Sequence, residues 1–215
     1  MRYSVLWPVL LTGLLAGCLS EQKETNAVSN TTNANTTQMV ALGDKLFHDV
    51  SLSSQGNQAC ASCHNVNQAF SDADQTMPVS KGSEVGQFGT RNTPAASYTR
   101  FIPDLHQEQE DGETLWKGGL FLDGRVNSLE EQAQKPFLNP AEMNNKDAAD
   151  VVAKLRASTN ANLFREVFGS DALDIGKEDQ AFGQMAQAIA AFERTPVFSP
   201  FSSKFDFYLQ GKAQF

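Results

Sequence analysis

Two cysteines and a histidine stand together in the segment Cys60-Ala61-Ser62-Cys63-His64. Two thiols three residues apart can each form a thioether with a vinyl group of one porphyrin. The histidine that follows can then supply an axial nitrogen to the iron. The spacing therefore predicts that Cys60, Cys63 and His64 hold one covalently bound haem c.

Other uses of paired cysteines fit the sequence less well. The chain has three cysteines, whereas a structural zinc site needs four Cys or His ligands. Beyond the motif itself, only His48 and His106 are left to complete such a site. A thioredoxin-like redox pair needs a βαβ setting, and no such pattern surrounds Cys60 and Cys63.

The N-terminus has the layout of a secretory signal peptide. Arg2 precedes an apolar run from Val5 to Leu15, which is too short for a membrane span. The run closes with Leu15-Ala16-Gly17-Cys18, which resembles the lipobox of bacterial lipoproteins. We therefore expect a signal peptide over 1–17 and a lipid anchor on Cys18, with an ordinary signal peptide and an incidental cysteine as the alternative. Leu19 stands where an aspartate would retain a lipoprotein in the inner membrane, which favours the outer membrane.

Export and the haem motif support each other, because haem is attached to c-type cytochromes outside the cytoplasm. We expect a periplasmic protein that meets the membrane through its lipid anchor only. Residues 18–38, rich in Asn, Thr and Ser, predict a flexible tether, so the haem domain should span 39–215. The net charge of −8 argues against nucleic-acid binding and favours a positively charged redox partner, with a merely solvated surface as the alternative.

Helical patterns dominate the rest of the chain. Val40–Phe47 predicts a short helix, and the turn at Cys60 should begin another. Ser128 and Glu131 fit a capping box that starts a helix through Gln134, which Pro136 should end. Three further groups have helical spacing: Val151, Val152 and Leu155; Leu163, Phe164, Val167 and Phe168; and Phe182, Met185, Ile189 and Phe192.

No region shows sustained alternation of apolar and polar residues, so strands should be few or absent. A long loop is expected over 75–109, where Gly, Pro, Ser and Thr are frequent. The predicted fold is therefore mainly α, a cytochrome c-like helical haem domain with long loops.

Several sequence blocks occur in an order known from one protein family. They are Gly43–Phe47, Leu52-Ser53, the haem motif, Arg91–Pro94, Asp123–Arg125, Leu129–Ala133, Pro136, Asn139-Pro140, Glu142-Met143, Ala190–Thr195 and Phe205–Leu209. With these blocks the chain resembles the first half of the bacterial di-haem cytochrome c peroxidases, which include the methylamine dehydrogenase maturation (MauG-like) enzymes. The resemblance covers nearly all of residues 39–211.

The resemblance implies a domain that reduces hydrogen peroxide with electrons from a small donor cytochrome or copper protein. It implies His64 as the proximal iron ligand, Glu142 as the general acid–base and Gln132 as the group that positions peroxide. A carboxylate beside peroxide can move a proton from its inner to its outer oxygen. From spacing alone, Gln132 would be a surface helix residue and Glu142 a carboxylate stabilised by the dipole of a following helix.

Three further residues have two interpretations each. The resemblance implies that Asn92 helps bind a calcium ion, whereas Asn before Thr-Pro is also a turn former. Arg91 and Arg125 could pair with haem propionates, because guanidinium groups suit carboxylates, or form salt bridges within the protein.

The sequence departs from the family pattern in three places. It contains no second CxxCH motif, so an electron equivalent would have to reside elsewhere, with Tyr98 and Trp116 as candidates, or the domain would have to work with another protein. Leu122 stands where relatives have a tryptophan. The loop 77–89 lacks the histidine that caps the resting haem in many relatives, which suggests an open distal site. A monohaem electron-transfer cytochrome, with Met77 or His106 as sixth ligand, is the alternative to a whole or partial peroxidase domain.

Overall fold

The computed structural model of this protein describes residues 35–74 and 76–214. The predicted signal peptide over 1–17, the predicted lipid site at Cys18 and most of the predicted tether lie outside these residues. From Thr37 onward the chain forms one unit. In the part that is described, no helix combines the length and the apolar character needed to cross a bilayer.

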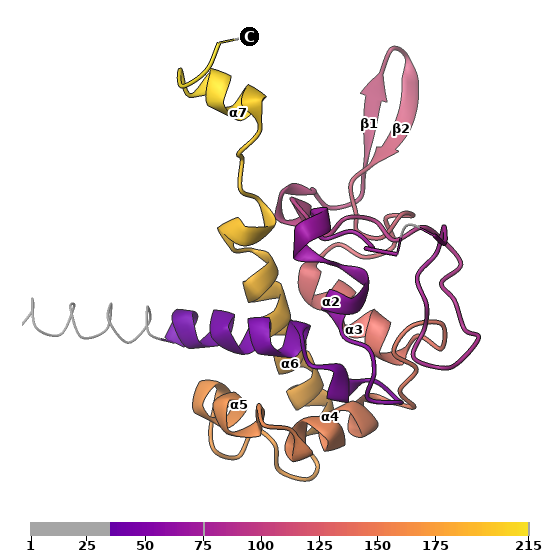
Figure 1. Cartoon of the computed structure of the whole chain (residues 1–215), viewed down its shortest axis with the longest axis vertical. Coiled ribbons are helices and arrows are strands. Elements are labelled where there is room, and N and C mark those ends of the chain that lie inside the picture. The colour runs from indigo at the N-terminus through magenta and orange to yellow at the C-terminus, as the bar shows by residue number, and fades with distance from the viewer. Residues whose placement is uncertain (1–34, 75, 215) are drawn as a thin grey trace, which may run out of the picture. The chain divides into compact units, whose positions relative to one another are not determined.

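Helix α6 (Glu178–Glu193) is the central element of this unit (Figure 1). Its buried face includes Phe182, Met185, Ile189 and Phe192, the four residues whose spacing predicts an apolar stripe. Helices α3 (Leu129–Leu138) and α4 (Ala148–Ala157) pack against α6. The prediction of this helix is confirmed, and the fold is mainly helical as expected.

Residues 35–47 are helical, which confirms the predicted helix at Val40–Phe47. The helix also takes in residues 35–38, which the sequence pattern assigns to the tether. Extending an existing helix by one residue is much easier than starting one, so a polar segment joined to an apolar helix can continue it. The helix buries Leu42, Leu46 and Phe47 and crosses α6 (Figure 1).

The crossing depends on a glycine. A Cβ atom added at Gly43 would lie 1.9 Å from the carbonyl oxygen of Ala188 in α6. No rotamer change can relieve such a contact, because the backbone fixes the position of Cβ and the carbonyl oxygen is itself a backbone atom. A side chain at residue 43 would therefore push the two helices apart.

We expect Gly43→Ala to lower the free energy of unfolding by about 1–3 kcal/mol, the usual cost of overpacking a core. Gly183→Ala is the matched control, because Gly183 also lies in a helix but an added Cβ meets nothing within 4 Å. That substitution should raise the free energy of unfolding by about 1 kcal/mol through helix propensity. Urea denaturation of the two variants measures both changes in the free energy of unfolding. A stabilising effect of Gly43→Ala would contradict the close crossing of the two helices.

Helix α3 begins as predicted but ends later. The Ser128 side chain accepts a hydrogen bond of 3.1 Å from the N–H of Glu131 and caps the helix. The helix continues to Leu138, so the prediction that Pro136 ends it is wrong. Proline has no N–H to donate to the carbonyl of Gln132, four residues earlier, but in the last turn this costs the helix only one bond. Burial of Phe137 against α6 favours the additional turn.

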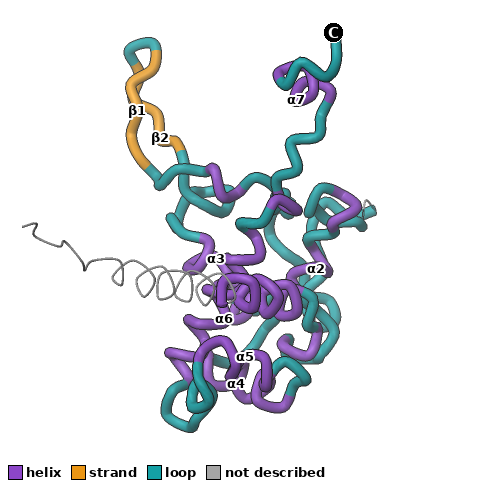
Figure 2. Tube along the Cα trace, turned by 90° about the vertical axis from the view of Figure 1, so that its left-hand side faces the viewer, coloured by secondary structure: helices purple, strands orange, loops and turns teal. Residues whose placement is uncertain are grey.

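The other two predicted helices are confirmed. Helix α4 is capped by Asp147, whose side chain accepts a bond from Asp150 N–H, and buries Val151, Val152 and Leu155. Helix α5 (Ala161–Phe168) follows after a short turn and buries Phe164. Figure 2 shows α4 and α5 together at one end of the helical body.

An antiparallel hairpin begins at the end of the segment predicted as a loop (75–109) and extends beyond it. Strand β1 (His106–Glu110) pairs with β2 (Glu113–Lys117), with His106 opposite Lys117. Nearly all of its residues are exposed, so the pattern lacks the apolar face by which strands are recognised in a sequence. The hairpin extends away from the helical body in both views (Figures 1 and 2).

Short turns complete the fold. Helix α2 (Cys60–Cys63) is a single turn, and α7 (Lys204–Leu209) carries exposed apolar residues after an extended segment. Single 3₁₀ turns lie at Val50–Leu52, Val66–Gln68, Thr99–Phe101 and Pro196–Phe198.

Four phenyl rings join the distant parts of the core. Phe70 and Phe198 stack with ring centroids 3.8 Å apart, and Phe47 meets Phe192 edge to face at 5.5 Å. The rings of Phe47 and Phe198 are also in edge contact at 5.6 Å. The cluster connects the helix of residues 35–47, the segment after the haem motif and the end of α6.

Candidate functional site

A cavity of about 390 Å³ lies between the haem motif, helix α3 and the C-terminal half of α6. Volumes of this size are typical of ligand sites. The eight site residues predicted within the described chain all line this cavity: Cys60, Cys63, His64, Arg91, Asn92, Arg125, Gln132 and Glu142. Segments separated by more than 80 positions in the sequence thus meet at one place.

The two cysteines stand on the single turn of α2. The turn is fixed at its start by a 3.0 Å hydrogen bond from Ala59 N–H to the Ser62 hydroxyl, and at its end by His64 N–H donating to Cys60 C=O at 2.9 Å. Burial raises the pKa of both thiols, so neither is a thiolate at neutral pH. Among the described residues, no three His, Cys, Asp or Glu side chains are grouped to bind a metal ion.

The imidazole of His64 is held in one orientation. Its Nδ1 lies 2.9 Å from the carbonyl oxygen of Phe70, which makes Nδ1 the N–H donor and leaves Nε2 with a free lone pair. Burial lowers the pKa of His64, against the hydrogen bond to Phe70, which raises it. A neutral imidazole with one nitrogen bound to a backbone carbonyl is the usual form of an axial metal ligand.

The partner of His64 has no signal in the sequence. Ala69 and Phe70 both have left-handed backbones, with φ of 53° and 59°, an arrangement uncommon outside glycine. This turn aims the Phe70 carbonyl at His64, while the Phe70 ring is locked against Phe198. Phe70 is therefore a residue of the site that sequence reasoning missed.

Glu142 lies in the turn that follows α3. Its N–H donates to Asn139 C=O at 3.0 Å, and the Asn139 side-chain amide donates to Glu142 Oε1 at 2.6 Å. The next helix starts at Ala148, so the interpretation of Glu142 as a helix-start carboxylate is not supported. Burial raises the pKa of Glu142, although the Asn139 bond opposes this. A half-buried carboxyl with a raised pKa is suited to accept and return a proton.

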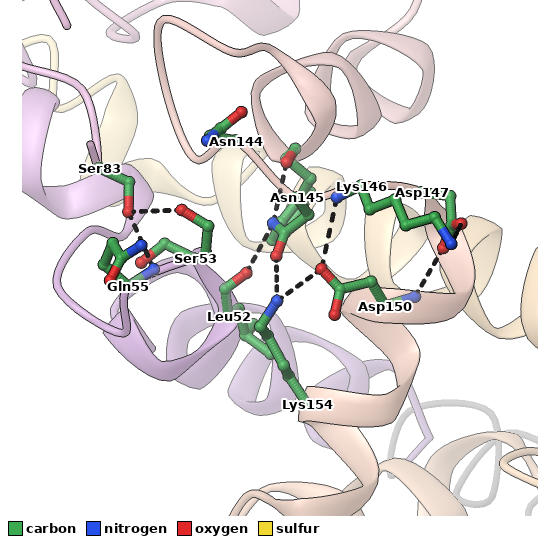
Figure 3. A network of polar contacts seen from close by, with 12 residues as sticks. Leu52, Ser53, Gln55, Ser83, Asn144, Asn145, Lys146, Asp147, Asp150 and Lys154 are labelled. Atoms are coloured by element: carbon green, nitrogen blue, oxygen red, sulfur yellow. Dashed lines mark hydrogen bonds and ion pairs between the residues drawn. The ribbon is translucent and has the colours of Figure 1, made fainter.

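The backbone around Glu142 is fixed by neighbouring segments. Ser83 N–H donates to Glu142 C=O at 2.7 Å, and Ser54 N–H donates to Met143 C=O at 2.8 Å. Next to these contacts, the Asn145 amide donates to the carbonyls of Leu52 and Phe137, each at 2.9 Å (Figure 3). Such a bonded turn holds a functional carboxyl in place without using its reactive oxygens.

Asn145 is in turn fixed from α4. Lys154 donates to Asn145 Oδ1 at 2.6 Å and to Asp150 Oδ2 at 2.7 Å (Figure 3). Every hydrogen-bonding atom of the buried Asn145 amide is thus paired. The turn that carries Glu142 is anchored to helix α4 as well as to the segment around Leu52.

Gln132 and Pro136 stand on the same face of α3 and both line the cavity. They are separated by one helical turn, so the proline ring lies beside the amide-bearing residue. Gln132 is half-buried rather than a fully exposed surface residue. Its position relative to Glu142 follows from the fold, because α3 leads directly into the turn at Asn139.

The two candidate arginines meet a single carboxylate. Arg91 Nη1 lies 2.7 Å from Asp123 Oδ2, and Arg125 Nη1 lies 2.7 Å from Asp123 Oδ1. The Arg125 guanidinium also lies over the Phe121 ring, 3.7 Å from its centroid. The structure therefore shows salt bridges within the protein, which is the second of the two interpretations of these arginines. Both arginines remain at the cavity rim with further N–H groups that can reach a ligand carboxylate.

The side-chain amide of Asn92 donates a hydrogen bond of 3.1 Å to the carbonyl oxygen of Pro78. The contact supports the turn interpretation, since it fixes the loop that carries Pro78. It leaves the Asn92 Oδ1 as the atom that could serve as an oxygen ligand.

Several other candidates lie away from the cavity lining. His106 belongs to the exposed hairpin and bonds to Asp104 C=O, and Met77 is exposed in the loop. Trp116 is 65% exposed on β2. Among the methionine and histidine side chains in the described chain, other than His64, only Met143 lines the cavity. Leu122 also lines the cavity, and it stands where the family resemblance implies a tryptophan that this chain does not have.

These residues fit a covalently attached haem. Two neutral thiols and a correctly oriented imidazole stand on one turn, at the wall of a cavity that also buries an unpaired carboxyl oxygen of Glu193. The haem would be held by Cys60 and Cys63 through thioethers and by the Nε2 of His64.

Comparison with known proteins gives the same answer. Residues 37–214 match the family model "Di-haem cytochrome c peroxidase". The "Methylamine utilization protein MauG" of Paracoccus denitrificans is 39% identical over 181 residues, which is 82% of this chain and 46% of that protein. The "Cytochrome c peroxidase Ccp" of Escherichia coli is 33% identical over 81% of this chain and 31% of that protein.

A solved structure confirms the predicted fold class. The diheme peroxidase BthA from Burkholderia thailandensis superposes with a TM-score of 0.73 at 32% identity, over 82% of this chain and 43% of that one. The chain thus spans less than half the length of these relatives. Because the family model matches nearly all of the described residues, this chain belongs to the di-haem cytochrome c peroxidase family, which implies covalently bound haem c as its cofactor.

Proposed function

We propose that this chain is a haem peroxidase domain that reduces hydrogen peroxide with electrons from a small redox protein, either a cytochrome or a copper protein. One observation carries the proposal. The imidazole of His64, with Nε2 free, and the half-buried carboxyl of Glu142 line the same cavity. Peroxide cleavage needs an axial ligand on the haem iron and an acid–base group in the haem cavity.

The chain would carry one haem, attached through Cys60 and Cys63 and ligated by His64. When bound, it supplies the iron at which the O–O bond is cleaved. Glu142 accepts a proton from the inner oxygen of the peroxide and delivers it to the outer oxygen, which then leaves as water. Gln132 holds the peroxide by amide hydrogen bonds. Two electrons from the redox protein and two protons from solvent complete the conversion of one peroxide to two water molecules.

The rim of the cavity has supporting functions. Arg91 and Arg125 would donate their remaining N–H groups to the haem propionates while Asp123 holds them in place. Asn92 stabilises the loop at Pro78, and its free Oδ1 is the atom offered to a calcium ion, which would need further oxygen ligands.

The proposed location is the periplasm, with a lipid on Cys18 as the membrane anchor and the outer membrane as the preferred site. The lipobox-like Leu15–Cys18 segment and the need to attach haem outside the cytoplasm support it. Globomycin treatment, which blocks lipoprotein signal cleavage, should cause the longer precursor to accumulate.

The function is tested by producing the chain in a host that matures c-type cytochromes. The protein should be coloured, keep its pigment in acidified acetone, and consume hydrogen peroxide when supplied with a reduced small cytochrome or copper protein. A coloured protein that consumes no peroxide above the rate of free haem would refute the catalytic proposal and leave the cofactor assignment intact.

The alternative, a monohaem electron carrier, has one observation in its favour. Met143 is the one thioether of the described chain that lines the cavity, and a thioether sixth ligand would convert the haem to an electron-transfer site. Met143 is 3% exposed and packs in the main hydrophobic cluster, which favours a structural role. We expect Met143→Leu to leave the ferric spectrum high-spin and unchanged. A change from low-spin to high-spin on this substitution would establish the carrier instead.

A further inference from the structure

The cavity contains a second buried carboxyl, which no sequence motif assigns to a function. Glu193 is the last residue of α6, is 6% exposed and lines the cavity together with Cys60 and Glu142. A glutamate is rarely buried to this degree unless a partner compensates it. The partners of Glu193 therefore decide what the residue can do.

Glu193 has no partner in the described protein. Its Oε2 is buried, and no described residue donates a hydrogen bond to it. The adjacent Arg194 is turned away and holds Glu130 through two bonds, at 2.6 and 2.8 Å. The C-terminal end of a helix also disfavours negative charge, because the last carbonyls point outward there. Position, burial and the competing ion pair all favour the neutral acid.

The other charged groups around the cavity do not reverse this preference. Burial raises the pKa of Glu193 to about 8, Arg194 opposes the increase and Glu130 adds to it. The further titratable or charged groups at the cavity wall are Glu142, Lys81, Arg91, Arg125, His64 and the thiols of Cys60 and Cys63. Of these, Lys81 is already paired with Asp74 at 2.9 Å. After burial itself, the Glu193 carboxyl is the largest influence that raises the pKa of Cys60, so Glu193 lies close enough for its ionised form to act on a haem-attachment residue.

We propose that Glu193 is a proton-binding residue of the haem cavity, which takes up a proton when the haem is reduced and releases it when the haem is oxidised. The electron comes from the small redox protein of the proposed function and the proton from solvent, so one positive charge enters with each electron. The proposal rests on the haem of the proposed function but not on peroxide reduction. Its physical basis is that an added electron makes ionisation of a carboxyl in the same low-dielectric cavity less favourable.

The test is potentiometric titration of the intact, haem-loaded protein at a series of pH values. In the wild type, the midpoint potential should fall as pH rises through the region of the Glu193 pKa, since the reduced protein binds more protons there. Glu193→Gln should lose this slope. Glu131→Gln is the matched control, because it makes the same chemical change at an exposed glutamate of α3 outside the cavity lining, and it should keep the slope.

Three results would overturn the proposal: a wild-type potential independent of pH in this region, a slope that survives in Glu193→Gln, or a slope that is lost in Glu131→Gln. If Glu193→Gln does not retain haem, Glu193→Asp keeps the acid and must keep the slope. Wild-type redox-difference infrared spectra should also show the carbonyl band of a neutral carboxylic acid shifting with reduction. Colourless wild-type protein would overturn the proposed function as well, whereas coloured protein with a flat potential would overturn only this proposal.

Discussion

Replacing Glu142 by Gln should lower the rate of hydrogen peroxide reduction by about 10²–10⁴-fold, the usual contribution of a general acid–base. The amide has nearly the shape of the carboxyl, and its Oε1 can still accept the 2.6 Å hydrogen bond from the Asn139 amide. It cannot accept a proton from peroxide at neutral pH. The haem spectrum should therefore stay almost unchanged while steady-state turnover collapses.

Glu131→Gln is the control for this experiment. Glu131 lies on α3, only one residue from Gln132, but it is exposed and faces Lys135 at 3.9 Å rather than the cavity. The same chemical change at this position should leave turnover within a factor of two, by the small effect expected of an exposed pair. Equal losses in both variants, or undiminished turnover in Glu142→Gln, would remove Glu142 from the mechanism.

The pH profile of the wild type gives an independent check. Burial raises the pKa of Glu142, so the ionised, proton-accepting form is lost at a higher pH than for an ordinary glutamate. Turnover should fall as pH is lowered through this raised pKa, and the midpoint of the fall should lie above 4.5, the value of an unperturbed carboxyl. In Glu142→Gln this acid limb should be absent from the residual rate.

Local patterns in the sequence predicted much of the site. The motif at Cys60–His64 needs only one turn of backbone to bring its three groups together, and the structure forms that turn. The apolar stripe of α6 was likewise readable, because burial against two neighbouring helices requires a 3.6-residue period. The ordered family blocks then indicated which separate segments converge on one cavity.

Features that depend on packing or exposure in the folded protein are not predictable from local sequence patterns. Helix α3 ends later than the rule for proline predicts, since that rule does not include the burial of Phe137, which follows the proline. The hairpin has no signal in the sequence because its exposed strands lack alternation of apolar and polar residues. Glu193 stood inside a recognised block, yet its lack of a partner depends on Arg194 choosing Glu130, a contact between residues 64 positions apart.

Phe70→Ala should have the largest effect on stability. Phe70 is 4% exposed, and its ring stacks on Phe198 and meets Phe47. Removing such a ring from a core lowers the free energy of unfolding by about 3–5 kcal/mol, out of a total of roughly 5–15 kcal/mol for a domain. Denaturant unfolding followed by circular dichroism measures this loss.

The same substitution should also affect the haem ligand. The Phe70 carbonyl holds Nδ1 of His64 at 2.9 Å, and the anchored ring keeps the left-handed turn in place. Without the ring, the carbonyl loses its fixed direction, and the iron–imidazole vibration should broaden and move to lower frequency in resonance Raman spectra of the ferrous protein.

Phe164→Ala separates the two effects. Phe164 is equally buried, but it lies in α5 and its ring contact is with Phe168. This variant should lose a similar amount of stability while the iron–imidazole band stays where it is in the wild type. If both variants shift the band equally, the change reflects a general loosening of the core. If neither shifts it, the Phe70 ring stabilises the fold without positioning the ligand of the iron.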